Sequence, residues 1–354
     1  MNAEAILDKI SKEGGLTGAD LASLDLTGAN LAGALYEQVS FRGCILSGAN
    51  LTGATFISAD FTGANLAGTK LTGAQFRQSN LAGAILTKAQ MVECAMQGIN
   101  LSGADLSGAD LTRTHLAKTD LNDVKFIDAI LGMATFYQCR FSTVDFTGAD
   151  LTRVSLEGAD LSKAVFNKTN LTKAYLLGAR LTKQRFPGCT LLMSMMDKAD
   201  LQAADFAGAD ISQMSFAEAE LSAAVFKGVR GEYANFASAQ GKSADFSDAN
   251  LFMVTFQESL LEGADFSRAV IEQSLFIKAN CDKTRFIKSH LPYCDFSHAS
   301  MREADFTAAS LAYANMHGVQ MKDARWEGAD LATIYKTDGD LWEAEQWKPT
   351  ATGS

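Results

Sequence analysis

The chain has 354 residues, and its 41 acidic and 31 basic side chains give a formal net charge of −10 at pH 7. The mean hydropathy is zero and no apolar run is long enough to cross a bilayer, which excludes a protein built from membrane-spanning helices. The acidic balance also disfavours direct binding to nucleic acid, because such binding needs basic surfaces.

The first predicted element is a short amphipathic helix over residues 3–13, with Ile6, Leu7 and Ile10 on one side. This segment is too charged to be a signal peptide, so we expect a cytoplasmic protein. Repeat proteins need caps over their terminal repeats, and residues 1–15 are therefore predicted to form an N-terminal capping helix.

The rest of the chain is dominated by a period of five residues. From Leu16 to Leu331 nearly every fifth position carries a large apolar residue, and we call these positions centres. Of the 64 centres, 61 are Leu, Phe, Met, Ile, Tyr or Trp. The exceptions are Gly231, Gly241 and Cys281, and the two glycines predict thinner packing where they lie. A period of five is neither the helical 3.6 nor the strand period of 2.

Each pentapeptide has a recurring sequence pattern around its centre. A small residue lies two positions before the centre, Asp or Asn lies one before it, and Ser or Thr and then Gly follow it. The words Ala-Asn-Leu-Thr-Gly (49–53), Ala-Asp-Phe-Thr-Gly (59–63) and Ala-Asp-Leu-Ser-Gly (104–108) resemble the A(D/N)LxX consensus of the pentapeptide-repeat family. The resemblance implies a right-handed quadrilateral β-helix, with four pentapeptides in each coil.

The residues at the centres independently support four pentapeptides per coil. One class of centres, taken every 20 residues, holds ten Phe in succession from Phe126 to Phe306 and then Trp326, whereas the class from Leu31 to Leu331 holds none. We therefore predict an all-β fold, a right-handed quadrilateral parallel β-helix of about 16 coils over residues 16–335, with coils about 4.8 Å apart and short capping helices at the ends.

The frame of five fails after the last centre. Asp340 with Glu343 predicts a capping box and a short helix that extends to about Trp347, so residues 336–354 are predicted to form a C-terminal capping helix and tail. Trp342 and Trp347 are candidate residues either for this cap or for a homodimer contact through it, as the family resemblance implies.

No pattern of cysteines or histidines indicates an enzyme, a cofactor or a metal site. Five Cys lie at the small inward position and Cys281 lies at a centre, without CxxC spacing, so we expect buried free thiols. The four His lie at scattered outward positions, and we expect solvated surface even for His298 and His317, which are predicted neighbours on adjacent coils.

The favoured function is a rigid, rod-shaped, non-catalytic scaffold or adaptor that binds another protein; some pentapeptide-repeat proteins resemble accessory components of bacterial secretion machinery. Outward positions should be polar, yet apolar residues recur two positions after the centre on the face without Phe. The competing interpretation is scattered exposure of the ordinary kind. The candidate partner-binding residues are Leu192, Met193, Met195, Tyr233, Phe252, Met253, Tyr293 and Tyr313.

The alternative function, implied by the resemblance, is a DNA-mimicking modulator of DNA gyrase and topoisomerase IV that gives resistance to their poisons. The net charge has the required sign. Its size is small, because duplex DNA of the same length, about 77 Å, would carry about 45 charges. We therefore expect the scaffold rather than the mimic.

Overall fold

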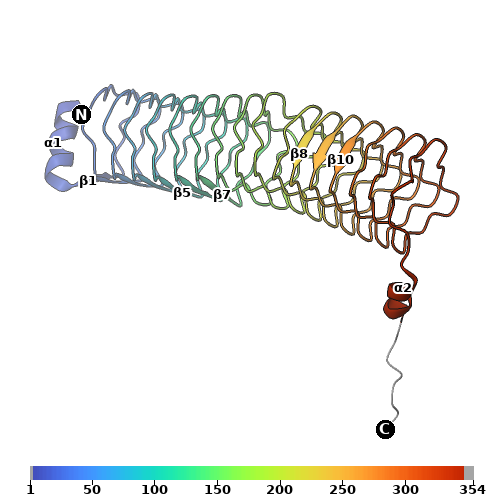
Figure 1. Cartoon of the computed structure of the whole chain (residues 1–354). Helices are drawn as coiled ribbons and strands as arrows, with labels where there is room; N and C mark the ends of the chain where they lie inside the picture. The colour runs from blue at the N-terminus through green and yellow to red at the C-terminus, as the bar shows by residue number, and fades with distance from the viewer. Residues whose placement is uncertain (1–2, 347–354) are drawn as a thin grey trace, which may run out of the picture. The chain divides into compact units, whose positions relative to one another are not determined.

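The structure, a computed structural model, describes residues 3–346 (Figure 1). The chain falls into two compact units, Met1–Asp200 and Leu201–Ser354, which we call unit 1 and unit 2. The pentapeptide pattern runs through both units, and its local geometry is the same in each.

Most pentapeptides outside the strands end in a tight turn that starts at the centre. The carbonyl of Leu46 accepts a 2.9 Å hydrogen bond from the N–H of Ala49, and Gly48 between them has a φ of 65°. This is the geometry of a type II turn, whose third residue needs positive φ and therefore favours Gly. The Asp before the centre closes the turn locally, since Asp60 Oδ1 accepts the N–H of Thr62 at 2.9 Å.

Unit 1 begins with one helix, which is followed by seven short parallel strands that pair in chain order. Each pairing joins residues 20 apart, as Gly15 with Leu35 and Leu35 with Thr55. The elements are α1 (Ala3–Glu13), β1 (Gly15–Thr17), β2 (Leu35–Glu37), β3 (Thr55–Ile57), β4 (Gln75–Arg77), β5 (Ala95–Gln97), β6 (His115–Ala117) and β7 (Thr135–Tyr137).

Unit 2 has three parallel strands. Their central residues belong to the class of centres without Phe, whereas the strands of unit 1 are centred on another class. The elements are β8 (Arg230–Glu232), β9 (Asn250–Phe252), β10 (Val270–Glu272) and α2 (Gly339–Gln346). Single bridges between residues 20 apart continue the stacking in both units. The predicted parallel β-solenoid is confirmed; within the two units it amounts to about 13 turns, slightly fewer than the 16 expected over the whole chain.

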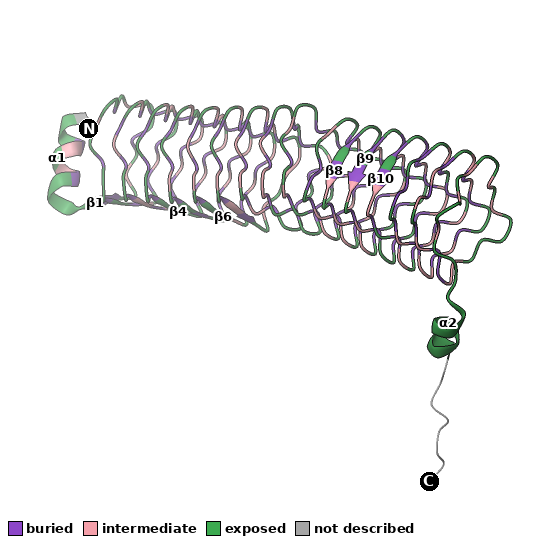
Figure 2. Ribbon diagram, viewed as in Figure 1, coloured by how far each residue is buried: buried purple, intermediate pink, exposed green. Residues whose placement is uncertain are grey.

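The centres and the small residues before them form the buried core of each unit (Figure 2). In unit 2 the Phe centres stack coil upon coil: the rings of Phe226, Phe246 and Phe266 have successive centroids 4.7 Å apart and planes within 4°. The rings of the neighbouring face meet them edge-on, as Phe256 meets Phe246 at 5.4 Å. The predicted alignment of Phe centres at intervals of 20 is therefore confirmed within unit 2.

The thin packing predicted at the two glycine centres is wrong. A Cβ added to Gly231 would lie 2.9 Å from Cδ2 of Leu251 and 3.1 Å from Cγ1 of Ile211, and one added to Gly241 would lie 3.0 Å from Cδ2 of Leu261. Aliphatic side chains of the adjacent coils lean over each glycine and fill the space that a larger centre would occupy.

The helix predicted over residues 3–13 is α1, and it covers the first coil of unit 1 (Figure 1). Ile6 and Ile10 are buried, as are Leu16 and Leu21 beyond them, because the apolar side of the helix packs on the end of the core. Across residues 3–346, no helix has both the length and the apolar character needed to cross a membrane.

Candidate protein-binding face

The structure places Tyr233, Met253, Tyr293 and Tyr313 in one outward column of unit 2, one residue per coil with Gln273 between. Each lies two positions after a centre, at the left-handed position of the turn, with φ between 51° and 59°. With Phe252, which lies beside Met253, these residues are called the apolar column. Backbone hydrogen bonds join successive coils along the column: the N–H of Tyr233 donates to the Phe252 carbonyl at 2.9 Å.

The aromatic side chains of the apolar column are exposed and ordered against one another. Tyr233 and Tyr293 are 53% and 54% exposed, which is unusual for large apolar side chains in a well-packed protein. The rings of Tyr293 and Tyr313 stack with centroids 5.1 Å apart and an angle of 11° between their planes. Tyr233 meets Phe252 edge-on at 6.0 Å. The rings are therefore partly fixed before any partner arrives.

The surface next to the apolar column combines apolar side chains with three charged ones, Arg230, Glu232 and Glu272, the last of which pairs with Phe252 in the sheet. Val270 is exposed on the same face, and Leu275 extends the apolar surface onto the next face. Arg230 and Glu232 form an ion pair of 2.6 Å beside Tyr233 and so neutralise each other. This face of unit 2 combines exposed rings, aliphatic side chains and little net charge, which is typical of the centre of a protein interface.

The remaining candidate residues lie in unit 1 and form a patch of their own. Leu192 and Met195 are exposed and Met193 is half-buried, again at a left-handed position. Met195 forms a bridge with Tyr175 one coil earlier, and that ring is also exposed. The structure therefore divides the eight candidate residues into two groups, one in each unit.

The charged faces of unit 2 are laced with ion pairs. Arg268 contacts Asp248 at 2.6 Å, and Arg285 contacts Asp265 at 3.4 Å. Further pairs join Lys242 to Glu262, Lys283 to Glu262 and Arg325 to Asp305. Four acidic groups, Asp248, Glu262, Asp265 and Asp305, are thus paired on the faces that carry them.

The predicted C-terminal helix is present as α2, with a different cap. Asp338, rather than Asp340, caps it: Asp338 Oδ1 accepts the N–H groups of Asp340 and Leu341 at 3.0 and 3.1 Å. The N–H of residue 340 is therefore already inside the first turn, which excludes Asp340 as the N-cap. Trp347 lies outside the described residues.

Helix α2 lies against the flank of unit 2, where Trp342 stacks on the ring of His298 at 6.2 Å. His317 is buried, not solvated as predicted, because α2 and Trp342 cover it. The carboxylate of Glu345 reaches the Nε2 atoms of both histidines, at 3.4 Å for His298 and 3.2 Å for His317. The 19-residue spacing of the histidines indicated their proximity, but nothing in the repeat indicated Glu345.

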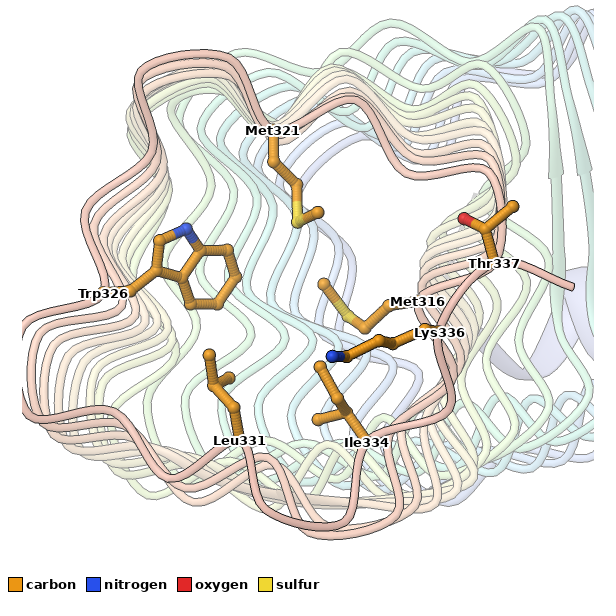
Figure 3. Close-up of a pocket in the computed structure, with 7 residues that line it drawn as sticks. All are labelled: Met316, Met321, Trp326, Leu331, Ile334, Lys336 and Thr337. Atoms are coloured by element: carbon orange, nitrogen blue, oxygen red, sulfur yellow. The ribbon is translucent and has the colours of Figure 1, made fainter.

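The last coil of unit 2 remains open in the part of the chain that the structure describes (Figure 3). A pocket of about 430 Å³ there is lined by Met316, Met321, Trp326, Leu331, Ile334, Lys336 and Thr337. Met321 is 43% exposed although it is a centre, and α2 buries none of its own residues. In the structure, α2 therefore does not cover the last coil. The homodimer contact stays a prediction.

The thiols behave as the sequence predicted for most positions. Cys44, Cys94, Cys281 and Cys294 are buried, all six cysteines are free, and Cys139 and Cys189 are only half-buried. Burial raises the pKa of the Cys94 thiol to about 12 and that of Cys139 to about 11. These side chains are therefore protonated packing residues at neutral pH rather than nucleophiles.

Among solved structures, the chain resembles HetL, a pentapeptide repeat protein involved in heterocyst differentiation regulation from the cyanobacterium Nostoc sp. strain PCC 7120. The identity is 19%, with 96% of this chain and 98% of that chain covered and a TM-score of 0.24. A trypsin-treated form of QnrB1, a plasmid-mediated fluoroquinolone resistance protein, is 21% identical, with 50% and 88% covered and a TM-score of 0.34. Rfr23 from the cyanobacterium Cyanothece 51142 is 19% identical, with 30% and 63% covered and a TM-score of 0.16.

No curated protein matches the chain. The family model described as pentapeptide repeats (8 copies) matches it in overlapping segments between residues 37 and 230 and again over residues 293–331. The stretch between these matches contains Gly231, Gly241 and Cys281, the three centres that depart from the pattern. Because the model matches more than half of its residues, the chain belongs to the pentapeptide-repeat family.

Proposed function

We propose that unit 2 is a non-catalytic protein-binding module and that its apolar column is the contact surface. The observation that carries the proposal is that three tyrosines and a methionine occupy left-handed, outward positions of the repeat. Bulky residues adopt this conformation at a cost of about 1–2 kcal/mol each, which Gly avoids. Many other side chains of the repeat share this conformation, so the gathering of exposed rings in one column, rather than the backbone, is what points to a contact surface.

The arrangement of the rings supports tight contact with a partner. Tyrosines are enriched among the residues that dominate binding energy, and truncating one such residue typically costs 2 kcal/mol or more. The Tyr293–Tyr313 stack restrains both rings before binding, so less side-chain freedom is lost when a partner packs on them. The patch around Leu192 and Met195 is proposed as a second, weaker contact on unit 1.

The DNA-mimic alternative receives less support from the surface. A mimic needs rows of acidic groups without counter-ions, because duplex DNA carries one negative charge per about 1.7 Å. In unit 2, Asp248 and Asp265 are instead paired with Arg268 and Arg285. A role in secretion machinery stays a prediction from family resemblance.

A photo-crosslinking amino acid identifies the contact surface directly. We expect that the full chain with the crosslinker at Tyr293 forms a specific adduct with a protein partner, whereas the same chain with the crosslinker at Lys288, on a charged face, does not. Mass spectrometry of the adduct identifies the partner. Equal adducts at both positions would contradict the proposal.

The matched test replaces side chains without disturbing the turns. The variant Tyr233→Gly, Tyr293→Gly and Tyr313→Gly inserts the residue that the turn prefers, and it should weaken binding of the crosslinked partner at least 30-fold. The control Ser243→Gly, Lys283→Gly and Glu303→Gly makes the same backbone change on another column and removes no net charge. It should bind normally.

A separate pair of substitutions decides between the two functions. If Asp245→Lys with Asp265→Lys abolishes partner binding while the tyrosine variant retains it, the acidic face is the working surface. A DNA gyrase supercoiling assay in the presence of a quinolone then tests the mimic, for which our proposal expects no protection.

A further inference from the structure

Three potential metal ligands converge where α2 meets the flank of unit 2. His298 and His317 lie on adjacent coils, with the N–H of His298 donating to the His317 carbonyl at 2.8 Å. Glu345 comes from α2 and places one carboxylate oxygen 3.4 Å from Nε2 of His298 and the other 3.2 Å from Nε2 of His317. The ligand atoms of the three side chains all lie within 4.8 Å of one another.

Neighbouring residues hold these three side chains in place. Trp342 stacks on His298 with only 19° between the ring planes, and Asp338 caps the helix that carries Glu345. Gly318 leaves room for the arrangement, because a Cβ there would lie 2.7 Å from Nδ1 of His298 and 2.9 Å from Cζ3 of Trp342. The site is therefore assembled from two coils and a helix, and contacts other than a metal bring the three side chains together.

We propose that His298, His317 and Glu345 bind one divalent transition metal ion of the zinc class. Zinc takes imidazole nitrogen and carboxylate oxygen at about 2.0–2.2 Å in a tetrahedron, so its ligand atoms lie about 3.3–3.5 Å apart. The two nitrogen-to-oxygen distances, 3.2 and 3.4 Å, have the length of such an edge but involve different carboxylate oxygens, so the Glu345 carboxylate turns to bring one oxygen to this distance from both nitrogens. A water molecule completes the four ligands.

Without metal, the same groups form a hydrogen-bonded latch. Nδ1 of His317 accepts the N–H of Asp338 at 3.2 Å, so Nε2 carries the proton and donates it to Glu345. Metal binding at Nε2 moves this proton to Nδ1, and the Asp338 amide turns away. Losing that hydrogen bond lowers the affinity by about tenfold.

The charge of the surroundings sets the strength of the site. Lys336 lines the same pocket as the three ligands and opposes a cation, whereas Asp338 there favours one. The metal ties α2 to the coils, so its binding converts a latch of two hydrogen bonds into a fixed attachment of the helix. The site serves to hold structure in place and rests on geometry that is separate from the apolar column.

The test is equilibrium dialysis of the full chain against Zn²⁺, followed by metal analysis. We expect one zinc per chain, with at least a tenfold loss of affinity in each of His298→Ala, His317→Ala and Glu345→Gln. The matched controls are His290→Ala and Glu343→Gln, an exposed histidine on another face and a second glutamate on α2. Both controls should bind zinc as the unchanged chain does.

Co²⁺ absorption shows which side chains bind the metal. Ligation by His and Glu gives weak visible bands, whereas thiolate ligation adds intense near-ultraviolet charge-transfer bands. Thiolate bands, equal zinc affinity in the Glu345→Gln variant, or zinc binding no stronger than in the His298→Ala, His317→Ala double variant would each overturn the proposal. Glu345 lies on the exposed helix, so its variant keeps the test valid if a histidine variant misfolds.

Discussion

The two units share the same repeat, but the aromatic rings in their cores pack differently around Phe146 and around Phe246. In unit 1 the rings of Phe126, Phe146 and Phe166 stack at 5.5 and 5.6 Å without a second column beside them, after coils filled mainly by Leu and a shorter interlocked group formed by Tyr36, Phe41, Phe56, Phe61 and Phe76. In unit 2 two columns of Phe interlock, so that Phe246 has stacked partners at 4.7 Å on both sides and edge-on partners at 5.5 and 5.4 Å. The five-residue sequence pattern determines where each centre lies, but it does not determine how closely the side chains of the centres pack.

The surfaces differ along the same division. Residues 201–354 hold 22 acidic and 13 basic side chains, whereas residues 1–200 hold 19 and 18, so nearly the whole net charge lies in unit 2. Unit 2 also carries the three exposed tyrosines of the apolar column.

The largest expected effect concerns the interlocked rings. Phe→Ala in a core typically costs about 3–5 kcal/mol. Each aromatic pair adds about 0.5–1.5 kcal/mol, so Phe246→Ala should destabilise its coil by about 1–2 kcal/mol more than Phe146→Ala does. Native-state hydrogen exchange measures the local opening free energy beside each substitution, which is needed because neighbouring repeats open locally.

The two substitutions remove the same atoms, so each is the other's control. Equal losses at both positions would show that the ring geometry of unit 2 adds nothing beyond burial. Phe246→Leu sharpens the comparison further, because it introduces the aliphatic filling of unit 1 and should recover part of the loss.

A smaller effect is expected at Gly231. Restoring the centre of the repeat by Gly231→Leu should destabilise unit 2 by about 1–3 kcal/mol, because Leu251 and Ile211 already occupy the space. Urea denaturation followed by circular dichroism measures the change. The second substitution Leu251→Ala should restore part of the stability in the Gly231→Leu background; a stabilising Gly231→Leu alone would mean that a gap does exist.

The smallest effect is the response to acid, which should be alike in the two units. Burial raises the pKa of Asp60 and Asp305, but hydrogen bonds from Thr62 and Thr307 and nearby arginines outweigh it, so both pKa values lie below the usual 3.8. A lowered native pKa stabilises the fold above the unfolded pKa, and this contribution is lost as the pH falls through the native value.

The urea midpoint should therefore stay level from about pH 7 to 5 and fall below about pH 4. Asp60→Asn in unit 1 and Asp305→Asn in unit 2 should each flatten the fall slightly, by less than about 1 kcal/mol because both groups are only partly buried and their ion pairs lie at the surface. A markedly steeper fall in one variant would show that its unit depends on its carboxylates more than the other does.

Most of the fold follows from the period of five. The centres from Leu16 onward, the small residues before them, and the helix over residues 3–13 depend on local patterns that recur or are strongly amphipathic. The positions of the outward apolar residues follow in the same way, because the slot two after a centre always points out. Periodic patterns predict such features because each coil repeats the environment of the last.

Features that depend on a single contact were not predictable. Whether the space beside Gly231 is filled depends on the orientation of the Leu251 side chain. The burial of His317 depends on where α2 docks. The docking in turn depends on Asp338, which caps α2 and lies after the frame of five has failed. The convergence of Glu345 on two histidines therefore needed the structure.

The left-handed position of each turn has a consequence for how this surface can change over evolutionary time. The residues found there with positive φ include Lys, Gln, Asp, Met and Tyr, but among the described residues none is Val, Ile or Thr. Thr143 and Thr333 occupy the same slot and are not left-handed. Branching at Cβ disfavours this conformation, so the surface can be rewritten with many unbranched side chains while the core stays untouched.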